Sequence, residues 1–311
     1  MATLTLNGHP IDLTNTDKVF FPDAGLTKGD LVDYYRRMAD VMLPHLRDRP
    51  LTMHRFPDGI HGEGFYQRKV PDHFPDWIER VTLETEGGES THLVCNDAAT
   101  LVVLANYGCV TPHVWLSRTN ALRTPDRLVV DLDPPGDDLD YFPQVQAAAR
   151  ALHDLLDDLG LAAFVTTTGS RGLHVVAPLR REHDFDTVRT FAQDLTAVFA
   201  ARHPDALTTA QRKAKRKGRV FLDVQRVAYA QSAMAPYAVR ARPGAPVATP
   251  LAWDEANDPD LSPRRYTMQN IFRRLGQKDD PWKDLARHAR ALDAPRQRLD
   301  ALLDDLDLPE D

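Results

Sequence analysis

Residues 128–136 read LVVDLDPPG. The apolar run predicts a buried strand, which the two prolines and the glycine end. Residues i and i+2 of a strand point to the same face, so Asp131 and Asp133 are expected side by side at the strand's end. Like charges at that distance repel unless a cation lies between them, and hard cations such as Mg²⁺ or Mn²⁺ take carboxylate oxygens. The stretch predicts a divalent-metal site for phosphoryl chemistry; the alternative is a solvated aspartate pair before a turn.

Composition places the chain among globular proteins with one large or two moderate domains. It has 311 residues, of which 42% are hydrophobic and 27% are charged. The net charge of −7 excludes an overall basic nucleic-acid coat, so a polyanionic partner needs a local patch. Cys95 and Cys109 are too few for a disulfide framework or a zinc cluster. No signal peptide or membrane-spanning run is evident, so we expect a cytoplasmic protein without a membrane partner.

Helices and strands alternate in a mixed order around this stretch, which predicts an α+β fold. We expect strands over 127–133, 162–168, 173–179 and 219–224, and helices over 139–159 and 185–202. Before them, Asn7-Gly8 predicts a hairpin turn, and Thr27 with Asp30 predicts a capped helix start. After them, Ser262-Pro263 is typical of an N-cap followed by the first residue of a helix.

A second motif, TTGSRGLHV at 167–175, joins two of the expected strands. Its two glycines let backbone N–H groups and the Ser170 hydroxyl approach an anion closely. Arg171 adds positive charge, and His174 lies on the strand that leaves the turn. The motif predicts a triphosphate cradle, with a hairpin turn followed by a buried histidine as the alternative.

The strand expected at 219–224 carries Asp223 near its end. A third carboxylate beside Asp131 and Asp133 would complete a two-metal site, which clamps the attacking and leaving oxygens of an in-line displacement. The alternative is an ordinary strand-end aspartate. The preceding segment RKAKRKGR at 212–219 concentrates positive charge and predicts contact with a phosphate backbone or a triphosphate, unless it is a solvated loop.

The order of these motifs resembles the primase-like polymerase domain of bacterial DNA ligase D, of the archaeo-eukaryotic primase superfamily. DLDP at 131–134, TTGSRGLHV, VFLD at 220–223 and APYAVRARPGAPV at 235–247 follow one another as in that family. Further matches are LTNTDKV at 13–19, GLTKGD at 25–30, GFYQRK at 64–69 and PLAW at 250–253, so the resemblance covers nearly the whole chain. Two departures are Arg171, where lysine is common, and VQRVAYAQS at 224–232; they bear on nucleotide preference and efficiency.

The resemblance implies an α+β primase-polymerase fold, with a mixed or antiparallel catalytic sheet flanked by helices and an N-terminal α/β portion packed against it. The chain would be a single polymerase module. Residues 1–120 would bind the DNA end and its 5′-phosphate, residues 121–255 would form the catalytic core, and residues 256–311 would form C-terminal helices. The chain shows no nuclease or ligase segment, so we expect a stand-alone enzyme or an excised domain.

The resemblance also assigns site residues. Asp131, Asp133 and Asp223 would hold two Mn²⁺ or Mg²⁺ ions, and His113 would belong to the active site. The residues that would bind the nucleoside triphosphate, NTP or dNTP, are Ser170, Arg171, His174, Arg226, Arg240 and Arg55. The residues that would bind DNA and its 5′-phosphate are Lys18, Lys28, Asn15, Phe65 and Tyr66. Lysines do bind phosphate as point charges and aromatic rings do stack on bases, although surface lysines and a core aromatic pair are the alternatives.

The implied function is template-dependent polymerisation at gaps or broken DNA ends in non-homologous end joining. Ribonucleotide preference, Mn²⁺ activation, and Ku and an ATP-dependent DNA ligase as partners are implied with it, as is a bacterial cytoplasmic location at the nucleoid. Three alternatives stay open: a primase that starts chains de novo, a non-catalytic DNA-end-binding module, and a nuclease. The three aspartates would serve a nuclease too, but the Ser170–His174 cradle suits a triphosphate better.

Overall fold

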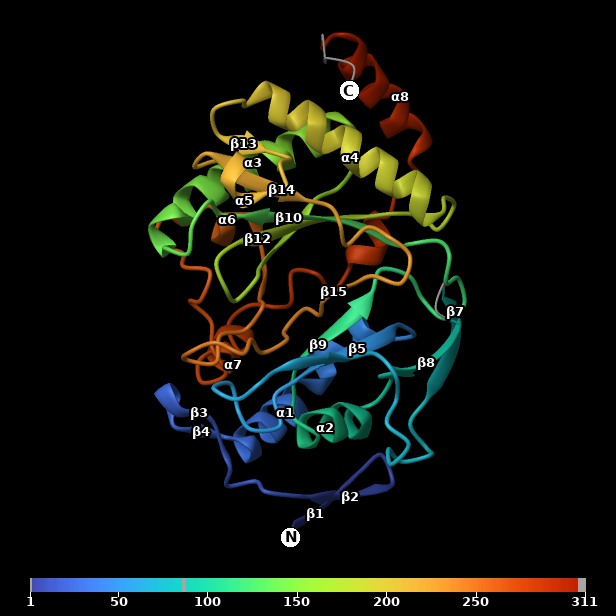
Figure 1. Cartoon of the computed structure of the whole chain (residues 1–311), viewed down its shortest axis with the longest axis vertical. Coiled ribbons are helices and arrows are strands. Elements are labelled where there is room, and N and C mark those ends of the chain that lie inside the picture. The colour runs from blue at the N-terminus through green and yellow to red at the C-terminus, as the bar shows by residue number, and fades with distance from the viewer. Residues whose placement is uncertain (1, 86–87, 307–311) are drawn as a thin grey trace. The chain divides into compact units, whose positions relative to one another are not determined.

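The computed structural model describes residues 2–85 and 88–306, which form two compact units (Figure 1). The first unit comprises Met1–Asn120, Ser232–Thr249 and Tyr266–Asp280. The second comprises Ala121–Gln231, Pro250–Arg265 and Pro281–Asp311. Each unit is therefore assembled from three separate stretches of chain. The division into an end-binding portion, a catalytic core and C-terminal helices stays a prediction, because it assigns roles as well as boundaries.

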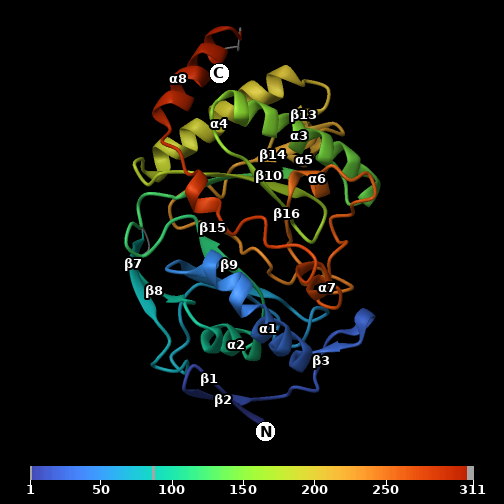
Figure 2. The same ribbon diagram turned by 180° about the vertical axis from the view of Figure 1, so that it is seen from behind.

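The first unit combines a sheet with helices packed on it. Its strands are β1 (Ala2–Leu6), β2 (His9–Leu13), β3 (Val19–Phe21), β4 (Leu26–Thr27), β5 (Pro50–Arg55), β6 (Phe65–Gln67), β7 (Arg80–Thr85), β8 (Gly88–Val94), β9 (Cys109–Trp115) and β15 (Ser232–Met234). Its helices are α1 (Lys28–Leu46), α2 (Ala98–Asn106) and α7 (Ile271–Leu275). The main sheet has the order β15-β9-β5-β8-β7, with β6 paired to β5, and α1 and α2 lie side by side below it (Figures 1 and 2).

Local signals set the start of this unit as expected. The β1–β2 hairpin turns at Asn7 and Gly8, both with positive φ (52° and 80°). Helix α1 begins after Thr27, whose side chain accepts a hydrogen bond from the Asp30 backbone N–H, while the Asp30 carboxylate accepts one from the Thr27 backbone N–H. The predicted capping box is thus present, and it satisfies backbone donors that the helix cannot pair itself.

The second unit is built on a sheet with the order β13-β14-β10-β12-β11-β16. Its strands are β10 (Arg127–Asp133), β11 (Phe164–Thr167), β12 (Leu173–Pro178), β13 (Leu207–Thr208), β14 (Val220–Asp223) and β16 (Pro250–Leu251). Its helices are α3 (Phe142–Asp158), α4 (Phe185–Arg202), α5 (Lys213–Arg216), α6 (Trp253–Ala256) and α8 (Asp293–Asp304). All neighbouring strands run antiparallel except β13 and β14, which confirms the predicted mixed sheet.

Strand β10 lies in the interior of this sheet, and α3 and α4 cover one face (Figures 1 and 2). Leu128, Val130 and Leu132 are fully buried. Because side chains alternate along a strand, the two aspartates point to the opposite face, and both are partly exposed. The period-2 pattern read in the sequence therefore places carboxylates on one face and apolar packing on the other.

The prediction that a helix begins at Ser262-Pro263 is wrong. These residues form a turn, in which the Ser262 carbonyl accepts a hydrogen bond from the Arg265 backbone N–H. The chain then becomes extended, because Tyr266 O accepts from Val247 N and Thr267 bridges to Pro246. Tertiary pairing with a distant segment outweighs the local cap signal. Within the described residues, no helix is both long and apolar enough to cross a membrane.

Candidate active site

A row of polar side chains crosses the sheet of the second unit. Asp131 on β10 is directly opposite His174 on β12 and directly opposite Asp223 on β14. Directly opposite residues of antiparallel strands share one face, with Cβ atoms about 4.5–5.5 Å apart. Asp133, two residues along β10, lies on the same face opposite Phe221. The register therefore gathers three carboxylates and one imidazole from separate parts of the chain.

The electrostatics show that these carboxylates are close together. Burial, and then the negative charge of Asp131, raise the pKa of Asp133 to about 6. The charge of Asp223 acts in the same direction, while Arg171 and Arg216 oppose it. Arg216, on α5, stacks its guanidinium 3.9 Å from the centre of the Phe221 ring. A cation among these carboxylates would relieve the repulsion between them, which adds to the effect of burial on this pKa.

In this conformation two of the three carboxylates contact other groups. The Asp131 carboxylate is 3.4 Å from His174 Nε2, and Asp223 Oδ1 accepts a 2.7 Å hydrogen bond from Gln225 N. Among the described residues, no group of three or more His, Cys, Asp or Glu side chains is arranged to hold a metal ion. The donors nevertheless suit a hard cation, since all three are carboxylates. Binding one would require the Asp131 and Asp223 side chains to turn from these partners toward a point shared with Asp133.

The turn at 168–172 packs directly against β10. Thr168 N and the Thr168 hydroxyl both donate to Gly172 O, and the same hydroxyl accepts from Ser170 N at 3.3 Å and Gly172 N at 3.2 Å. A Cβ atom at Gly172 would collide with the Leu132 carbonyl oxygen, so only glycine allows this approach. The turn therefore holds Ser170 beside the strand that carries Asp131 and Asp133.

Arginines of the second unit lie near these residues in sequence or in space. Arg171 forms an ion pair with Asp137, and Arg226 is exposed on the segment after β14. Arg264 was not predicted, yet its Nε donates a 2.8 Å hydrogen bond to Ser170 O. Arg216 was predicted only as part of a basic segment. Local sequence gives no sign of the position of Arg264, because it lies 94 residues beyond Ser170.

In the first unit, the structure brings Lys18 and Lys28 together. Lys28 is only 5% exposed, and its Nζ donates to Thr14 Oγ1 at 3.1 Å and to Asn106 O at 2.8 Å. Burial, and then the charge of Lys18, lower the pKa of Lys28. Lys18 donates to Pro57 O and pairs with Asp58. Two cations at the N-terminus of α1 suit an anion such as phosphate.

Asn15 shapes the loop that presents Lys18. Its φ is 50°, in the left-handed region that asparagine tolerates, and its carbonyl accepts a hydrogen bond from Lys18 N at 3.1 Å. The Lys18 carbonyl in turn accepts from Lys28 N at 2.8 Å. The backbone therefore ties the three predicted residues into one small structure.

Phe65 and Tyr66 are exposed on β6, by 43% and 58%, which excludes the core aromatic pair that the sequence left open. The Tyr66 ring stacks on His54 at 4.1 Å and on His113 at 5.3 Å between centroids. Arg55, whose Nε donates to Tyr107 O, lies 5.4 Å from the Phe65 ring. The result is an aromatic surface with a cation at its side, which suits stacking on bases.

Arg240 also belongs to the first unit. Burial, and then the charge of Arg240, lower the pKa of His54 to about 4, so Arg240 lies close to this aromatic surface. The predicted residues thus form two groups. The group in the second unit consists of Asp131, Asp133, Asp223, Ser170, Arg171, His174 and Arg226. The group in the first unit consists of Lys18, Lys28, Asn15, Arg55, Phe65, Tyr66, His113 and Arg240.

The sequence is similar to a known family of polymerase domains. Residues 27–282 match the family described as LigD, primase-polymerase domain. The chain is 33% identical over 278 residues to the multifunctional non-homologous end joining DNA repair protein LigD of Mycobacterium tuberculosis, and 31% identical over 282 residues to the bifunctional LigD of Bacillus subtilis. These alignments cover 87% and 90% of the chain, but only 36% and 45% of the relatives.

A solved structure resembles the chain over almost its whole length. It is the polymerase domain from Mycobacterium tuberculosis ligase D in complex with DNA, with a TM-score of 0.83 and 32% sequence identity. The match covers 90% of this chain and 99% of that one. The similarity therefore extends to both units, and it concerns one domain of longer relatives.

Proposed function

The chain belongs to the family of LigD primase-polymerase domains, and we propose on that premise that it is a template-dependent nucleotidyltransferase that extends primer 3′-ends. The observation that carries the proposal is the row His174–Asp131–Asp223 across three strands, with Asp133 beside it. A carboxylate cluster next to a glycine-bearing turn with a hydroxyl and an arginine suits the transfer of a phosphoryl group from a triphosphate.

In the proposed reaction, the primer 3′-oxygen bonds to the α-phosphorus of the nucleotide, the bond to the bridging oxygen breaks, and pyrophosphate leaves. Two Mn²⁺ or Mg²⁺ ions, held by Asp131, Asp133 and Asp223, would supply activation of the hydroxyl and charge stabilisation. The protein's own groups bind and orient. Ser170 and the backbone around it face the phosphates, Arg171 adds charge, and His174 can hydrogen-bond a phosphate oxygen.

The first unit supports DNA as the substrate. Lys18 and Lys28 form an anion site suited to a 5′-phosphate, and Phe65 and Tyr66 offer exposed rings to template bases. Arg55, Arg240 and His113 lie around the same aromatic surface and would contact nucleotide or template. Because the relatives are named as end-joining proteins, we propose filling of gaps at broken DNA ends.

The finer features of that role are part of the same proposal. They are a preference for ribonucleotides, activation by Mn²⁺, cooperation with Ku and an ATP-dependent ligase, and action in the bacterial cytoplasm. Primer extension on gapped DNA with ribo- and deoxynucleotides, each in Mg²⁺ and in Mn²⁺, measures the first two directly. An unprimed template in the same assay separates extension from de novo priming.

The decisive variant changes both carboxylates of β10, Asp131→Asn with Asp133→Asn. We expect extension to fall by about 10³-fold or more, because the charges that would hold the ions are lost. Binding to gapped DNA should change little, since the anion site and aromatic surface are intact. Asp140→Asn, an exposed aspartate after the same strand, is the matched control and should extend primers like the wild type. Full extension by the double variant would refute the metal-site role.

A further inference from the structure

The Ser170 carbonyl, at the centre of the turn 168–172, accepts a hydrogen bond from a residue 94 positions further along the chain. That residue is Arg264, whose Nε lies 2.8 Å from Ser170 O. The hydrogen bonds inside the turn all involve Thr168, and none of them reaches the peptide unit that joins Ser170 to Arg171. In the part of the chain that the structure describes, Arg264 is therefore the one residue that hydrogen-bonds this peptide unit.

This hydrogen bond determines the direction of the Arg171 N–H group. A peptide unit is planar, and in its usual trans form the C=O and N–H bonds point to opposite sides. Because Arg264 holds Ser170 O, the N–H of Arg171 points away from Arg264. Within residues 2–85 and 88–306, neither this N–H nor the Ser170 hydroxyl has a hydrogen-bond partner, so both donors are available to an anion.

The same hydrogen bond makes the Arg171 N–H a better donor. A guanidinium on the carbonyl oxygen polarises the whole peptide unit, and hydrogen bonds in series strengthen one another where water is largely excluded. Water is largely excluded here, since Ser170 is only 8% exposed. Arg264 therefore affects both the direction and the strength of a backbone donor in the turn.

The segment that carries Arg264 is itself fixed to the sheet. Gln146 of α3 is buried, and its Nε2 donates to Asp258 O at 2.9 Å, while the Asp258 carboxylate pairs with Arg265 at 2.7 Å. The Ser262 hydroxyl accepts from Arg264 N at 3.3 Å, and the Ser262 carbonyl accepts from Arg265 N at 3.0 Å. Because α3 packs on β10 and β12, these bonds connect the backbone of Arg264 to the strands on either side of the turn's base.

We propose that Arg264 is a positioning residue of the nucleotide-binding turn. It holds the Ser170–Arg171 peptide unit so that the Arg171 N–H and the Ser170 hydroxyl donate to a phosphate group of the incoming triphosphate. It acts through Ser170 O and does not itself contact the nucleotide. This assignment rests on the proposed polymerase function and deepens it, because it gives the turn a support that none of the sequence motifs contains.

Steady-state primer extension by Arg264→Ala tests the assignment. A turn that is no longer held binds the nucleotide more weakly in the ground state and in the transition state alike, which raises KM and changes kcat little. We expect KM for the nucleotide to rise about tenfold, because a hydrogen bond from a charged donor is lost. Affinity for gapped DNA without nucleotide should stay unchanged. A purely structural defect would instead reduce the amount of active protein, which lowers kcat and leaves KM as it is.

Salt separates positioning from simple attraction between charges. Attraction between exposed charges is screened within about 8–10 Å at moderate salt. If the geometry of the peptide unit is the cause, the ratio of KM in Arg264→Ala to KM in the wild type should stay constant from about 0.05 M to about 0.3 M salt. Arg264→Lys keeps the charge and a single donor without the planar geometry, so it should recover part of the loss.

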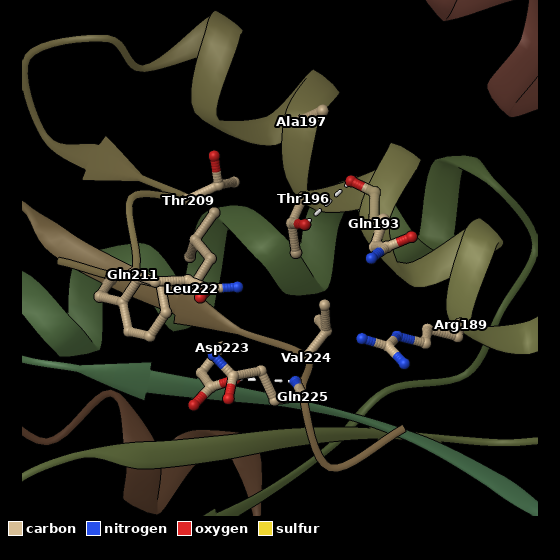
Figure 3. Close-up of a pocket in the computed structure, with 11 residues that line it drawn as sticks. Arg189, Gln193, Thr196, Ala197, Thr209, Gln211, Leu222, Asp223, Val224 and Gln225 are labelled. Atoms are coloured by element: carbon tan, nitrogen blue, oxygen red, sulfur yellow. Dashed lines mark hydrogen bonds between the residues drawn. The ribbon is translucent and has the colours of Figure 1, made fainter. Parts of the chain in front are cut away.

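Arg189→Ala is the matched control. Arg189 is exposed on α4, which covers the face of the sheet opposite to the aspartates, and it lines a pocket beside that helix (Figure 3). Among the described residues, its guanidinium forms no hydrogen bond and no ion pair. The variant removes the same charge from the same unit and leaves the turn intact, so its KM for the nucleotide should equal that of the wild type.

Different failures have different meanings. If KM in Arg264→Ala is unchanged while the wild type extends primers, the assignment is overturned and the proposed function stands. A fall in kcat alone, or a rise in KM that disappears at high salt, overturns it equally. Arg264→Met keeps the aliphatic chain but no donor, and it takes the place of Arg264→Ala if that variant does not fold. If the wild type extends no primer under any metal condition, the proposed function itself fails.

Discussion

Asp133 shows at the scale of one residue how this site differs from an ordinary surface. Its pKa of about 6, against an ordinary value of 3.8, results from burial and from the neighbouring carboxylates. When the pKa of a carboxyl group is higher in the folded than in the unfolded protein, the folded protein loses stability as the pH rises from 3.8 to about 6. The reason is that the carboxyl group of the unfolded chain ionises first. At neutral pH the folded protein therefore bears the cost of burying this charge beside other carboxylates. Raised pKa values of this kind are common at functional sites.

Lys28 carries the next prediction at this scale. Lys28→Gln removes a cation that is almost fully buried next to a second one, without removing hydrogen-bonding capacity toward Thr14 and Asn106. We expect the preference for gaps with a 5′-phosphate over a 5′-hydroxyl to fall by about tenfold, because a charge-assisted contact is lost. The measurement is the ratio of affinities for the two gapped substrates.

Lys69→Gln is the control for this experiment, since Lys69 is exposed in the same unit. It should leave the ratio of affinities unchanged. The same ratio in Lys28→Gln and in the wild type would exclude Lys28 from phosphate recognition, and the anion site would then have another role.

At the scale of elements, α1 supports Arg240 through tyrosine hydroxyls. Tyr34 donates to Tyr237 O at 2.7 Å, and Tyr35 donates to Val110 O at 2.6 Å and accepts from Val239 N at 3.1 Å. Thr111 of β9 donates to Val239 O at 2.6 Å. These bonds hold the backbone just before Arg240 against α1 and β9. Helix α1 thus positions the backbone from which Arg240, a proposed nucleotide-binding residue, extends.

Tyr35→Phe tests this support. It leaves Val110 O and Val239 N without their partner, which costs about 1–3 kcal/mol of unfolding free energy. Because the backbone before Arg240 loosens, we expect KM for the nucleotide to rise severalfold while affinity for gapped DNA stays the same. Urea unfolding and steady-state kinetics measure the two effects. Tyr141→Phe, at an exposed tyrosine of the second unit, should change neither, and an unchanged KM in Tyr35→Phe would refute the link.

At the scale of the whole molecule, the second unit depends on the end of the chain. Trp282 is buried, and its Nε1 donates to Val165 O of β11 at 3.2 Å. Arg290 pairs with the chain after β12, and Arg296 of α8 forms a 2.6 Å ion pair with Asp194 of α4. Trp282, Arg290 and Arg296 all lie outside residues 121–255, the catalytic core predicted from sequence. That segment alone would therefore lack these contacts.

A chain that ends after Asp280 should therefore be much less stable than the full chain. Loss of the Trp282 side chain alone costs about 3–5 kcal/mol, so we expect a drop of ten degrees or more in the melting temperature. Thermal unfolding followed by circular dichroism measures it. Trp282→Phe keeps an aromatic ring and loses only the hydrogen bond and some packing, so its drop should be smaller. Equal stability of the truncated and full chains would show that these contacts are dispensable.

The sequence by itself determined the local elements and the chemistry. Strand β10 and helix α4 begin and end where the patterns predicted, and the Thr27 capping box formed as expected, because each depends on neighbours in the chain. The motifs also identified the family, and with it the mixed sheet. What failed locally was Ser262-Pro263, where pairing with a distant segment decides the conformation.

Only the tertiary structure decided which residues meet. The register of β10 with β12 and β14 aligns Asp131 with His174 and Asp223, although no local signal specifies a strand's partner or its register. Arg264 reaches Ser170 from a segment without a motif. The physical reason is that periodicity and capping act over a few residues, whereas a site is made by packing between segments far apart in the chain.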